Sequence, residues 1–328
     1  MDPKEPTRNL ALELVRVTEA AALSAGHQMG RGDKEAADAA AVSAMRLVLQ
    51  TVDMNGIIVI GEGEKDNAPM LYNGENVGNG SAPDVDVAVD PIDGTRPLAF
   101  GRSNSLATVA IAPRGTMFNP GPFVYMNKLA VGPEAKGRIN IERSITENLK
   151  AVAKAKNKHV EDLTTIILDR PRHDAMIAEI REVGARIRII PDGDVAAALM
   201  TAWPDAGVDM LIGIGGTPEG VLAACALRAM GGEIQGKLYA RDEKELGRGR
   251  EAGYDFDKIL TMDDLVSSED VFFAATGITD GELLQGVRYS GGGARTDSIV
   301  VRGLTGTVRQ ITAMHRTDKL NQLSAIKY

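Results

Sequence analysis

The stretch VDVAVDPIDGTRPLAFG, residues 85–101, joins an apolar, strand-like run to a turn with two carboxylates. Asp90 ends the run, Pro91 fixes the backbone, and Gly94 allows a sharp turn that residues with a Cβ atom avoid. Asp93 can therefore point back towards Asp90. Two carboxylates held close together repel one another unless a cation lies between them. Taken alone, the stretch fits a metal site and an Asx-type turn equally well.

Further acidic residues occur at comparable places earlier in the chain. Glu62 and Glu64 lie in IVIGEGEKD, after another short β-branched run, with glycines on both sides of Glu62. Asp38 follows Lys34 by one turn of a predicted helix, so the two share one helix face. The alternatives are a surface loop for the glutamates and an ordinary ion pair for Lys34 and Asp38.

The segment GIGGTPEG, residues 213–220, combines a glycine-rich turn with an acid at a predicted helix start. We expect Thr217 to be the N-cap, Pro218 the first helical residue and Glu219 part of the first turn. An acid there is also explained by the helix dipole alone. The same N-terminus could instead receive a phosphate group on its N–H groups.

Composition narrows the class of protein. The chain has 328 residues, a hydrophobic content of 44% and a net charge of −8, which argues against a nucleic-acid or anionic-membrane surface. Its one cysteine, Cys225, excludes an internal disulfide and is interpreted as an inert, buried thiol. No stretch is typical of a secretory signal or a membrane span, so we expect a cytoplasmic protein.

Periodicity predicts an α/β protein. Apolar residues recur at helical spacing over 9–29, and a second helix is expected after the N-cap Asp33. From about residue 160 the chain alternates strand, loop and helix. The segment ARDEKELGRGREAG, residues 240–253, is expected to be a solvated loop. The length favours two units, which we place at 1–160 (metal-binding) and 161–328 (completing the active site).

In combination, GRGDKEAAD, IVIGEGEKD, AVDPIDGT, RPRHD, PDGDVA and GIGGTPEG resemble the class II fructose-1,6-bisphosphatase family. This family belongs to the metal-dependent, lithium-sensitive sugar and inositol phosphatases. The resemblance covers about residues 8–315 and implies a layered α/β/α/β/α sandwich. The implied activity is hydrolysis of the 1-phosphate of fructose 1,6-bisphosphate to fructose 6-phosphate and phosphate, in gluconeogenesis. Sedoheptulose 1,7-bisphosphate is a possible additional substrate.

The resemblance also implies the residues of the site. Mg²⁺ or Mn²⁺ would be held by five acids, namely Asp38, Glu62, Asp90, Asp93 and Glu219. Thr95 would orient or activate a metal-bound water, with Lys34 and Asp66 close to the scissile phosphate. The residues expected to contact substrate are Tyr125, Arg170, Arg172, Asp192 and Asp194. The partner is a small sugar bisphosphate rather than nucleic acid or membrane, and a homo-oligomer, dimer or tetramer, is expected.

Two arginines suit the second phosphate of a bisphosphate. Arg170 and Arg172 flank Pro171, and their planar forks match a phosphate group. The alternative is a solvated loop. The neighbouring His173 is interpreted as opening a helix rather than as an acid or base.

Three other functions share part of this sequence pattern. Haloacid-dehalogenase phosphatases carry Asp-x-Asp, whereas Asp90 and Asp93 are three apart, which misplaces the second acid for an aspartyl nucleophile. A dinucleotide fingerprint fails because Pro218 stands at the third glycine. Inositol monophosphate and nucleotide bisphosphates stay open as substrates, because the metal site contacts only a phosphate.

Overall fold

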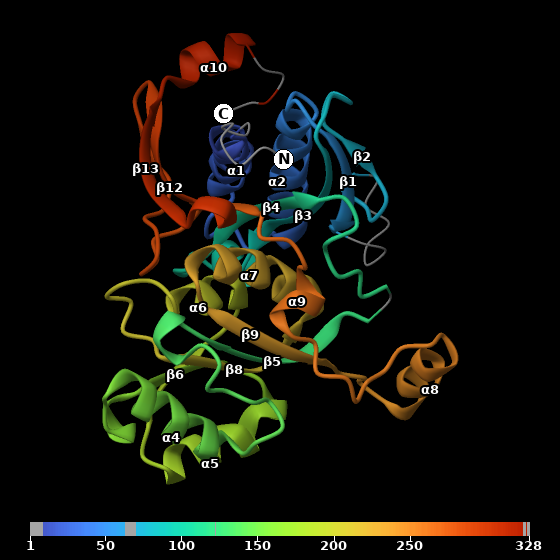
Figure 1. Ribbon diagram of the computed structural model, residues 1–328. Coiled ribbons are helices and arrows are strands. Elements are labelled where there is room, and N and C mark those ends of the chain that lie inside the picture. The colour runs from blue at the N-terminus through green and yellow to red at the C-terminus, as the bar shows by residue number, and fades with distance from the viewer. Residues whose placement is uncertain (1–8, 63–69, 122, 324–325, 327–328) are drawn as a thin grey trace.

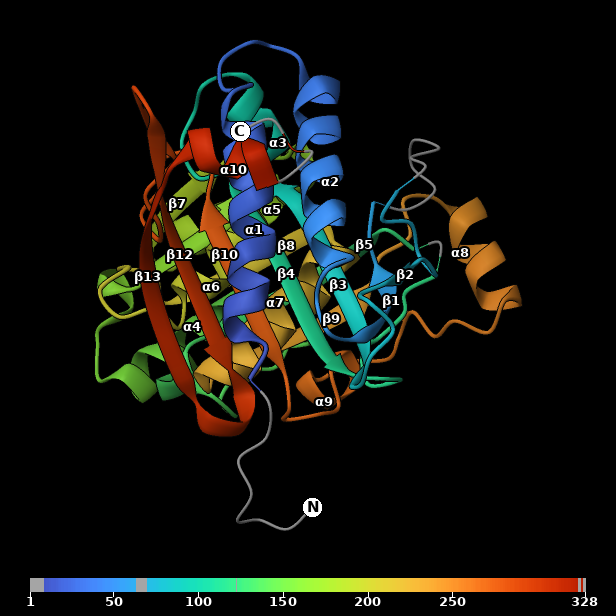
Figure 2. The ribbon, with the colours of Figure 1, turned by 90° about the horizontal axis from the view of Figure 1, so that it is seen from above.

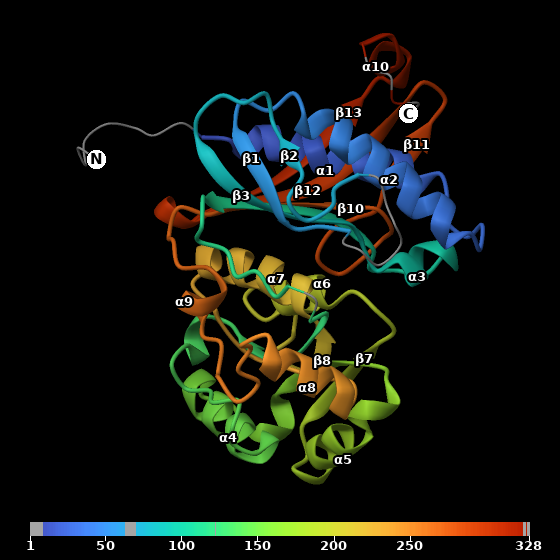
Figure 3. The ribbon, with the colours of Figure 1, turned by 90° about the vertical axis from the view of Figure 1, so that its right-hand side faces the viewer.

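Helices and two β-sheets alternate in layers through the molecule in the order α/β/α/β/α (Figure 1, Figure 3). The structure is a computed structural model that describes residues 9–62, 70–121, 123–323 and 326. Helices α1 (Ala11–Gly26) and α2 (Lys34–Leu49) cover the outer face of the first sheet, and lie side by side when seen from above (Figure 2). Helices α6 (Asp194–Met200) and α7 (Thr217–Met230) lie between the sheets, and α4 (Ile145–Lys156) and α5 (Asp174–Glu182) cover the second sheet. The expected layered α/β fold is confirmed.

The first sheet is mixed and 8-stranded, in the order β11-β12-β10-β4-β3-β1-β2, with β13 paired to β12. Only β1 and β3 run parallel among its described pairs. Its strands are β1 (Asn55–Ile60), β2 (Asn76–Val77), β3 (Asp84–Asp93), β4 (Leu106–Pro113), β10 (Phe272–Gly277), β11 (Arg288–Ser290), β12 (Gly293–Arg302) and β13 (Thr307–His315).

The second sheet is 5-stranded, in the order β7-β6-β8-β5-β9. Strand β6 is parallel to β7 and β8, and β5 is antiparallel to β8 and β9. Its strands are β5 (Tyr125–Val131), β6 (Thr164–Leu168), β7 (Arg186–Ile190), β8 (Met210–Gly216) and β9 (Glu233–Leu238). Both sheets take strands from either side of residue 160, and a division into two units there stays a prediction.

Helices α1 and α2 match the first two helices expected from the sequence. The bounds of the helices are α1 (Ala11–Gly26), α2 (Lys34–Leu49), α3 (Thr95–Ala99), α4 (Ile145–Lys156), α5 (Asp174–Glu182), α6 (Asp194–Met200), α7 (Thr217–Met230), α8 (Glu243–Glu251), α9 (Met262–Leu265) and α10 (Thr317–Leu323), with short 3₁₀ turns at Pro133–Ala135, Val160–Asp162, Pro171–His173 and Gly303–Thr305. None of the helices in the described part of the chain is long and apolar enough to cross a membrane.

Helix α7 is the centre of the fold, because it packs against both sheets. Its stretch 220–227 carries only glycine and apolar residues, all of them buried, as expected for a helix segment enclosed by the core. Cys225 is fully buried in it, and burial raises the pKa of its thiol to about 12. This agrees with an inert, structural cysteine.

Two local predictions were wrong. The segment expected to be a solvated loop contains helix α8, which projects from the body in Figure 1. It forms because the Asp242 side chain accepts the Glu245 N–H at 2.7 Å and caps the first turn, despite two glycines in the helix. Helix α7 begins one residue earlier than expected, with Gly216 as N-cap and Thr217 already helical.

Candidate active site

The turn after β3 supports both interpretations of its sequence. The pairing of β3 with β4 shifts register between Asp90 and Asp93, where Pro91 has no N–H for the ladder. The Asp90 carboxylate accepts the Ile92 N–H at 3.1 Å, which is an Asx turn. Gly94 then has φ +94°, in the left-handed region. Because the turn engages one oxygen of Asp90, the other can still serve as a ligand.

Thr95 connects this turn to a distant helix. Its hydroxyl donates to the Asp38 carboxylate at 3.1 Å and also lies 3.3 Å from the Ile92 carbonyl. Helix α2 begins at Lys34 because the Asp33 side chain caps it by accepting the Ala36 N–H. Asp38 lies one turn further along the same helix. Helix packing therefore brings Asp38, Lys34 and Thr95 to one end of the first sheet.

Asp93 connects the same turn to the segment PDGD. Its side chain, 3% exposed, accepts the Ala196 N–H at 3.0 Å and so stabilises the first turn of α6. Gly193, at φ +86°, reverses the chain immediately before that helix. Asp192 and Asp194 flank this glycine and are thereby placed beside Asp93.

The carboxylates lie close enough to change one another's ionisation. Burial raises the pKa of Asp90 well above its usual range, and the charges of Asp93, Glu219 and Glu62 raise it further. Burial likewise raises the pKa of Asp93, and Asp194 is the largest contributor among its acidic neighbours. Acids from different segments thus meet in one place, which we call the acidic region.

The glycines of GIGG leave room for two of these acids. A Cβ atom on Gly216 would lie 1.6 Å from a Glu219 carboxylate oxygen, and one on Gly215 would lie 1.9 Å from Asp194. The Lys128 ammonium donates to Asp194 at 2.5 Å and to the Gly216 carbonyl at 2.8 Å. Lys128 therefore joins β5, the start of α6 and the end of β8.

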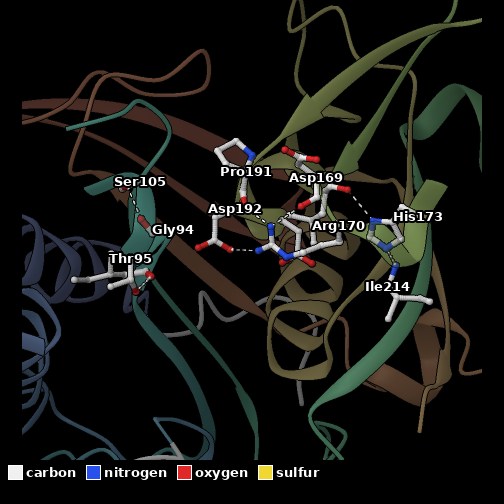
Figure 4. A network of polar contacts seen from close by, with 12 residues as sticks. Gly94, Thr95, Ser105, Asp169, Arg170, His173, Pro191, Asp192 and Ile214 are labelled. Atoms are coloured by element: carbon white, nitrogen blue, oxygen red, sulfur yellow. Dashed lines mark hydrogen bonds and ion pairs between the residues drawn. The ribbon is translucent and has the colours of Figure 1, made fainter. Parts of the chain in front are cut away.

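The two arginines of RPRHD are anchored by hydrogen bonds, although Arg172 is exposed and Arg170 is half-buried. Arg170 donates to the Pro191 carbonyl at 2.7 Å and faces the Asp192 carboxylate at 3.4 Å, as Figure 4 shows. Arg172 donates from Nε and Nη2 to the Ile214 carbonyl, at 3.1 and 2.7 Å. In the view of Figure 4, Asp192 lies between Arg170 and Thr95. The arginines are thus next to the acidic region.

His173 follows the two arginines and fixes the strand ends beside them. The Ile214 N–H donates to its Nε2 at 2.8 Å, so Nδ1 carries the proton and donates to the Leu168 carbonyl at 2.7 Å (Figure 4). The ring is fully buried, and burial is the main cause that lowers its pKa. A neutral histidine thus joins the ends of β6 and β8, which is a structural role.

Tyr125 lies beside the same strand ends. It is the first residue of β5 and pairs with Gly216 of β8. The Arg172 guanidinium carbon lies 5.2 Å from the centre of its ring, within the range of a cation–π contact. The Tyr125 ring and Arg172 therefore lie beside Gly216, against which the Glu219 carboxylate packs.

Comparison with known proteins identifies the family. Residues 8–315 match the sequence model of the bacterial fructose-1,6-bisphosphatases encoded by glpX. The chain belongs to this family. It is 48% identical over 325 residues to the class 2 fructose-1,6-bisphosphatase 1 of Escherichia coli strain K12, covering 95% of this chain and 96% of that protein. The class 2 enzymes of E. coli O6:H1 (strain CFT073) and Shigella flexneri match to the same extent.

For this member of the glpX family, the described residues expected at the site come from segments far apart in the sequence and lie around the ends of β3, β6 and β8. Asp66, like Glu64, lies outside the described residues. Sequence reasoning missed Lys128 and the structural role of His173. A signal for Lys128 was present, since a lysine inside the apolar strand YMNKLAV must pair its charge when buried.

The donor set suits the divalent cation that the family implies. Oxygen ligands are what Mg²⁺ and Mn²⁺ prefer. Burial is the main cause of the raised pKa of Asp90, and a cation would relieve the repulsion from neighbouring acids that raises it further. Within the described ranges, no three acidic, histidine or cysteine side chains already converge at ligand distance. Binding a cation would therefore require side-chain rotations. The Glu219 carboxylate lies against Gly216, where a Cβ atom would exclude it.

Proposed function

We propose that the chain hydrolyses the 1-phosphate of fructose 1,6-bisphosphate, releasing fructose 6-phosphate and phosphate. Membership of the bacterial fructose-1,6-bisphosphatase family supports this activity. The observation that carries the mechanism is the contact of Thr95 with Asp38 beside the acidic region. A hydroxyl oriented in this way is suited to a water that attacks phosphorus.

Thr95 positions that water. Its O–H donates to Asp38 at 3.1 Å, so an oxygen lone pair is directed elsewhere and can accept a hydrogen bond from the attacking water. A proton leaving that water can then pass to the Thr95 oxygen while the threonine proton moves to the Asp38 carboxylate. Water oxygen bonds to phosphorus as the bond to the sugar oxygen breaks. The sugar oxygen takes up a proton from solvent, and Asp38 later returns its proton to solvent.

Five acids would hold the metal: Asp38, Glu62, Asp90, Asp93 and Glu219. When bound, Mg²⁺ or Mn²⁺ would supply the positive charge that a transferring phosphoryl group requires. Lys34, at the first residue of α2, would add a further positive charge near that group. Asp66 is proposed, on the family resemblance alone, as a further acid beside the scissile phosphate.

The rest of the substrate would lie against the segments that carry the arginines. Arg170 and Arg172 are anchored through carbonyl groups, which leaves donors on each guanidinium for a second phosphate. Tyr125 would contact the same end of the sugar. Asp192 and Asp194 would accept hydrogen bonds from its hydroxyl groups.

Phosphate release tests the proposal. The protein is stripped with EDTA, then assayed with Mg²⁺ or Mn²⁺ restored on fructose 1,6-bisphosphate, sedoheptulose 1,7-bisphosphate, inositol monophosphate and adenosine bisphosphate. Metal-dependent release from the fructose substrate, well above the others, supports both site and substrate. Metal-dependent release mainly from another substrate would support the metal site but refute fructose 1,6-bisphosphate as the substrate. No release with either metal would refute the carboxylate site.

Three further properties belong to the proposal. Sedoheptulose 1,7-bisphosphate is a candidate additional substrate, because it offers the same two phosphates. We infer a cytoplasmic place in gluconeogenesis from the proposed reaction. A dimer or tetramer is expected, which light scattering at working concentration would test.

A further inference from the structure

A second arginine approaches the ring of Tyr125. The Arg241 guanidinium carbon lies 5.9 Å from the ring centre, and that of Arg172 lies 5.2 Å from it. Both distances fall within the roughly 6 Å of a cation–π contact. Arg241 is also the first exposed residue of the segment for which the sequence predicted only a solvated loop. Two guanidinium groups therefore gather on one aromatic ring.

The two arginines reach the ring from opposite neighbours of β5. Strand β5 lies between β8 and β9 in the sheet. Arg172 is tied to Ile214 of β8. Arg241 follows the end of β9, where the Tyr239 N–H donates to the Tyr125 carbonyl at 2.9 Å. The fold thus flanks Tyr125 with a positive charge on each side.

Arg241 is held in place by Glu245. The carboxylate accepts hydrogen bonds from Nε at 3.2 Å, from Nη2 at 3.0 Å and from the Arg241 backbone N–H at 2.6 Å. Glu245 is only 5% exposed, whereas 57% of the Arg241 side chain faces solvent. The hydrogen bonds from Arg241 lower the pKa of Glu245, so this acid stays ionised. The arginine is therefore pre-oriented before any ligand arrives.

Each guanidinium keeps donors for a ligand. A guanidinium carries five N–H groups, and the described contacts of Arg172 and Arg241 use Nε and Nη2. The carbonyl that accepts from Arg172 carries no formal charge, so it does not neutralise that arginine. Two guanidinium groups that approach one ring and keep unused donors suit an anion with several oxygens, such as a phosphate group.

The place of the cluster favours the phosphate that does not react. Tyr125 pairs with Gly216, and the Glu219 carboxylate packs against that glycine. The cluster thus lies beside the acidic region without being part of it. A substrate with one phosphate at the acids would direct a second phosphate towards the arginines.

We propose that Arg241 is a substrate-binding residue that, with Arg172 and on the Tyr125 ring, binds the second phosphate of a sugar bisphosphate. Glu245 is the positioning residue for it. This inference rests on the proposed bisphosphatase activity and adds a residue to its substrate site.

The test compares Arg241→Ala with Arg248→Ala, which removes an exposed arginine from helix α8, the helix that follows Arg241. For Arg241→Ala, KM for fructose 1,6-bisphosphate should rise roughly 10- to 100-fold, the usual effect of losing charge-assisted hydrogen bonds. The inhibition constant of fructose 6-phosphate should rise similarly. Turnover of fructose 1-phosphate, which lacks the second phosphate, should not change. Arg248→Ala should match the wild type throughout.

Further variants separate binding from folding, because Arg241→Ala leaves Glu245 buried without its partner. Arg241→Lys keeps the charge but loses the fork, and should still weaken fructose 6-phosphate inhibition. Glu245→Gln should give a smaller rise in KM, since it removes only the orientation. With Arg172→Ala, the double variant should lose less than the product of the two single effects, as expected for residues that bind one group.

The outcomes distinguish this inference from the proposed function. If the wild type does not hydrolyse fructose 1,6-bisphosphate, the proposed function fails. If it does, but Arg241→Ala and Arg248→Ala behave alike, the function stands and Arg241 is not a ligand. Equal losses on the bisphosphate and on fructose 1-phosphate would also overturn the role proposed for Arg241.

Discussion

Replacing Lys128 by methionine should strongly destabilise the protein. Lys128 lies within β5 and is 2% exposed, and Asp194 is 7% exposed. At 2.5 Å, with an effective dielectric constant of about 20, their attraction is about 7 kcal/mol before desolvation is considered. Removing one partner of such a buried pair costs about 3–5 kcal/mol, because the other charge stays buried. Methionine keeps most of the side-chain volume, so the loss measures the charge.

Denaturant unfolding with EDTA present measures this free energy. Lys128→Met should lower the free energy of unfolding by about 3–5 kcal/mol. Lys150→Met, at an exposed position of α4, is the matched control and should stay within about 0.5 kcal/mol of wild type. The Gly216 carbonyl also loses its 2.8 Å partner, so kcat on the proposed substrate should fall as well.

The second partner gives the sharper test, because the effect of changing it should reverse in sign. Asp194→Asn in the wild type leaves Lys128 buried without a carboxylate and should destabilise. In the Lys128→Met background the same change removes an uncompensated buried anion, and should restore about 1–3 kcal/mol. If Asp194→Asn destabilises equally in both backgrounds, the two residues are not coupled and the reasoning is refuted.

Other predictions concern the site and the stability of the protein. Thr95→Ala should fold and bind Mn²⁺, but its kcat should fall roughly 10²- to 10⁴-fold with KM little changed. Thr95→Ser keeps the hydroxyl and should recover most of the lost kcat. Equal kcat for Thr95→Ala and wild type would remove Thr95 from the mechanism. The backbone of Gly216, at φ −68°, accepts alanine, but the Cβ atom of Gly216→Ala would displace the Glu219 carboxylate. The Mn²⁺ concentration for half-maximal activity should therefore rise at least roughly tenfold. An unchanged concentration would argue against Glu219 as a ligand. Burial raises the pKa of Glu19 to about 7, so the folded protein holds the protonated carboxyl more tightly than the unfolded chain does. The stability that this proton contributes is complete below about pH 4.5 and is lost as the pH rises through 7. Glu19→Gln should therefore be more stable than wild type at pH 8.5 by about 1–3 kcal/mol and not at pH 4.5; thermal melts at both pH values check this.

Local sequence signals predicted the elements that hold the site. The N-cap Asp33, the glycine at 94 and the break at Gly231 appear in the structure at the expected places. Each depends on one or two neighbouring residues, through a capping oxygen or a backbone that needs positive φ. Such signals are local, so the sequence states them directly.

The errors occurred where neighbours in space overrode local preference. Helix α8 contains two glycines and a highly charged sequence, yet it is held at one end by Asp242 and by the Glu245 carboxylate. The start of α7 moved by one residue because Gly216 is extended and its carbonyl accepts from Lys128 of another strand. No pattern within either segment indicates these partners.

The sequence by itself determined the α/β class, the acids available to bind a cation and, through the combined motifs, the family. Only the tertiary structure decided that Asp38 accepts from Thr95, that Lys128 joins Asp194 to the Gly216 carbonyl, and that Arg241 faces Tyr125. Composition and spacing describe which groups a chain carries and how each segment folds. Contacts between residues 57, 66 or 88 positions apart depend on how helices and sheets pack, because the hydrophobic burial that orders the layers does not depend on sequence distance.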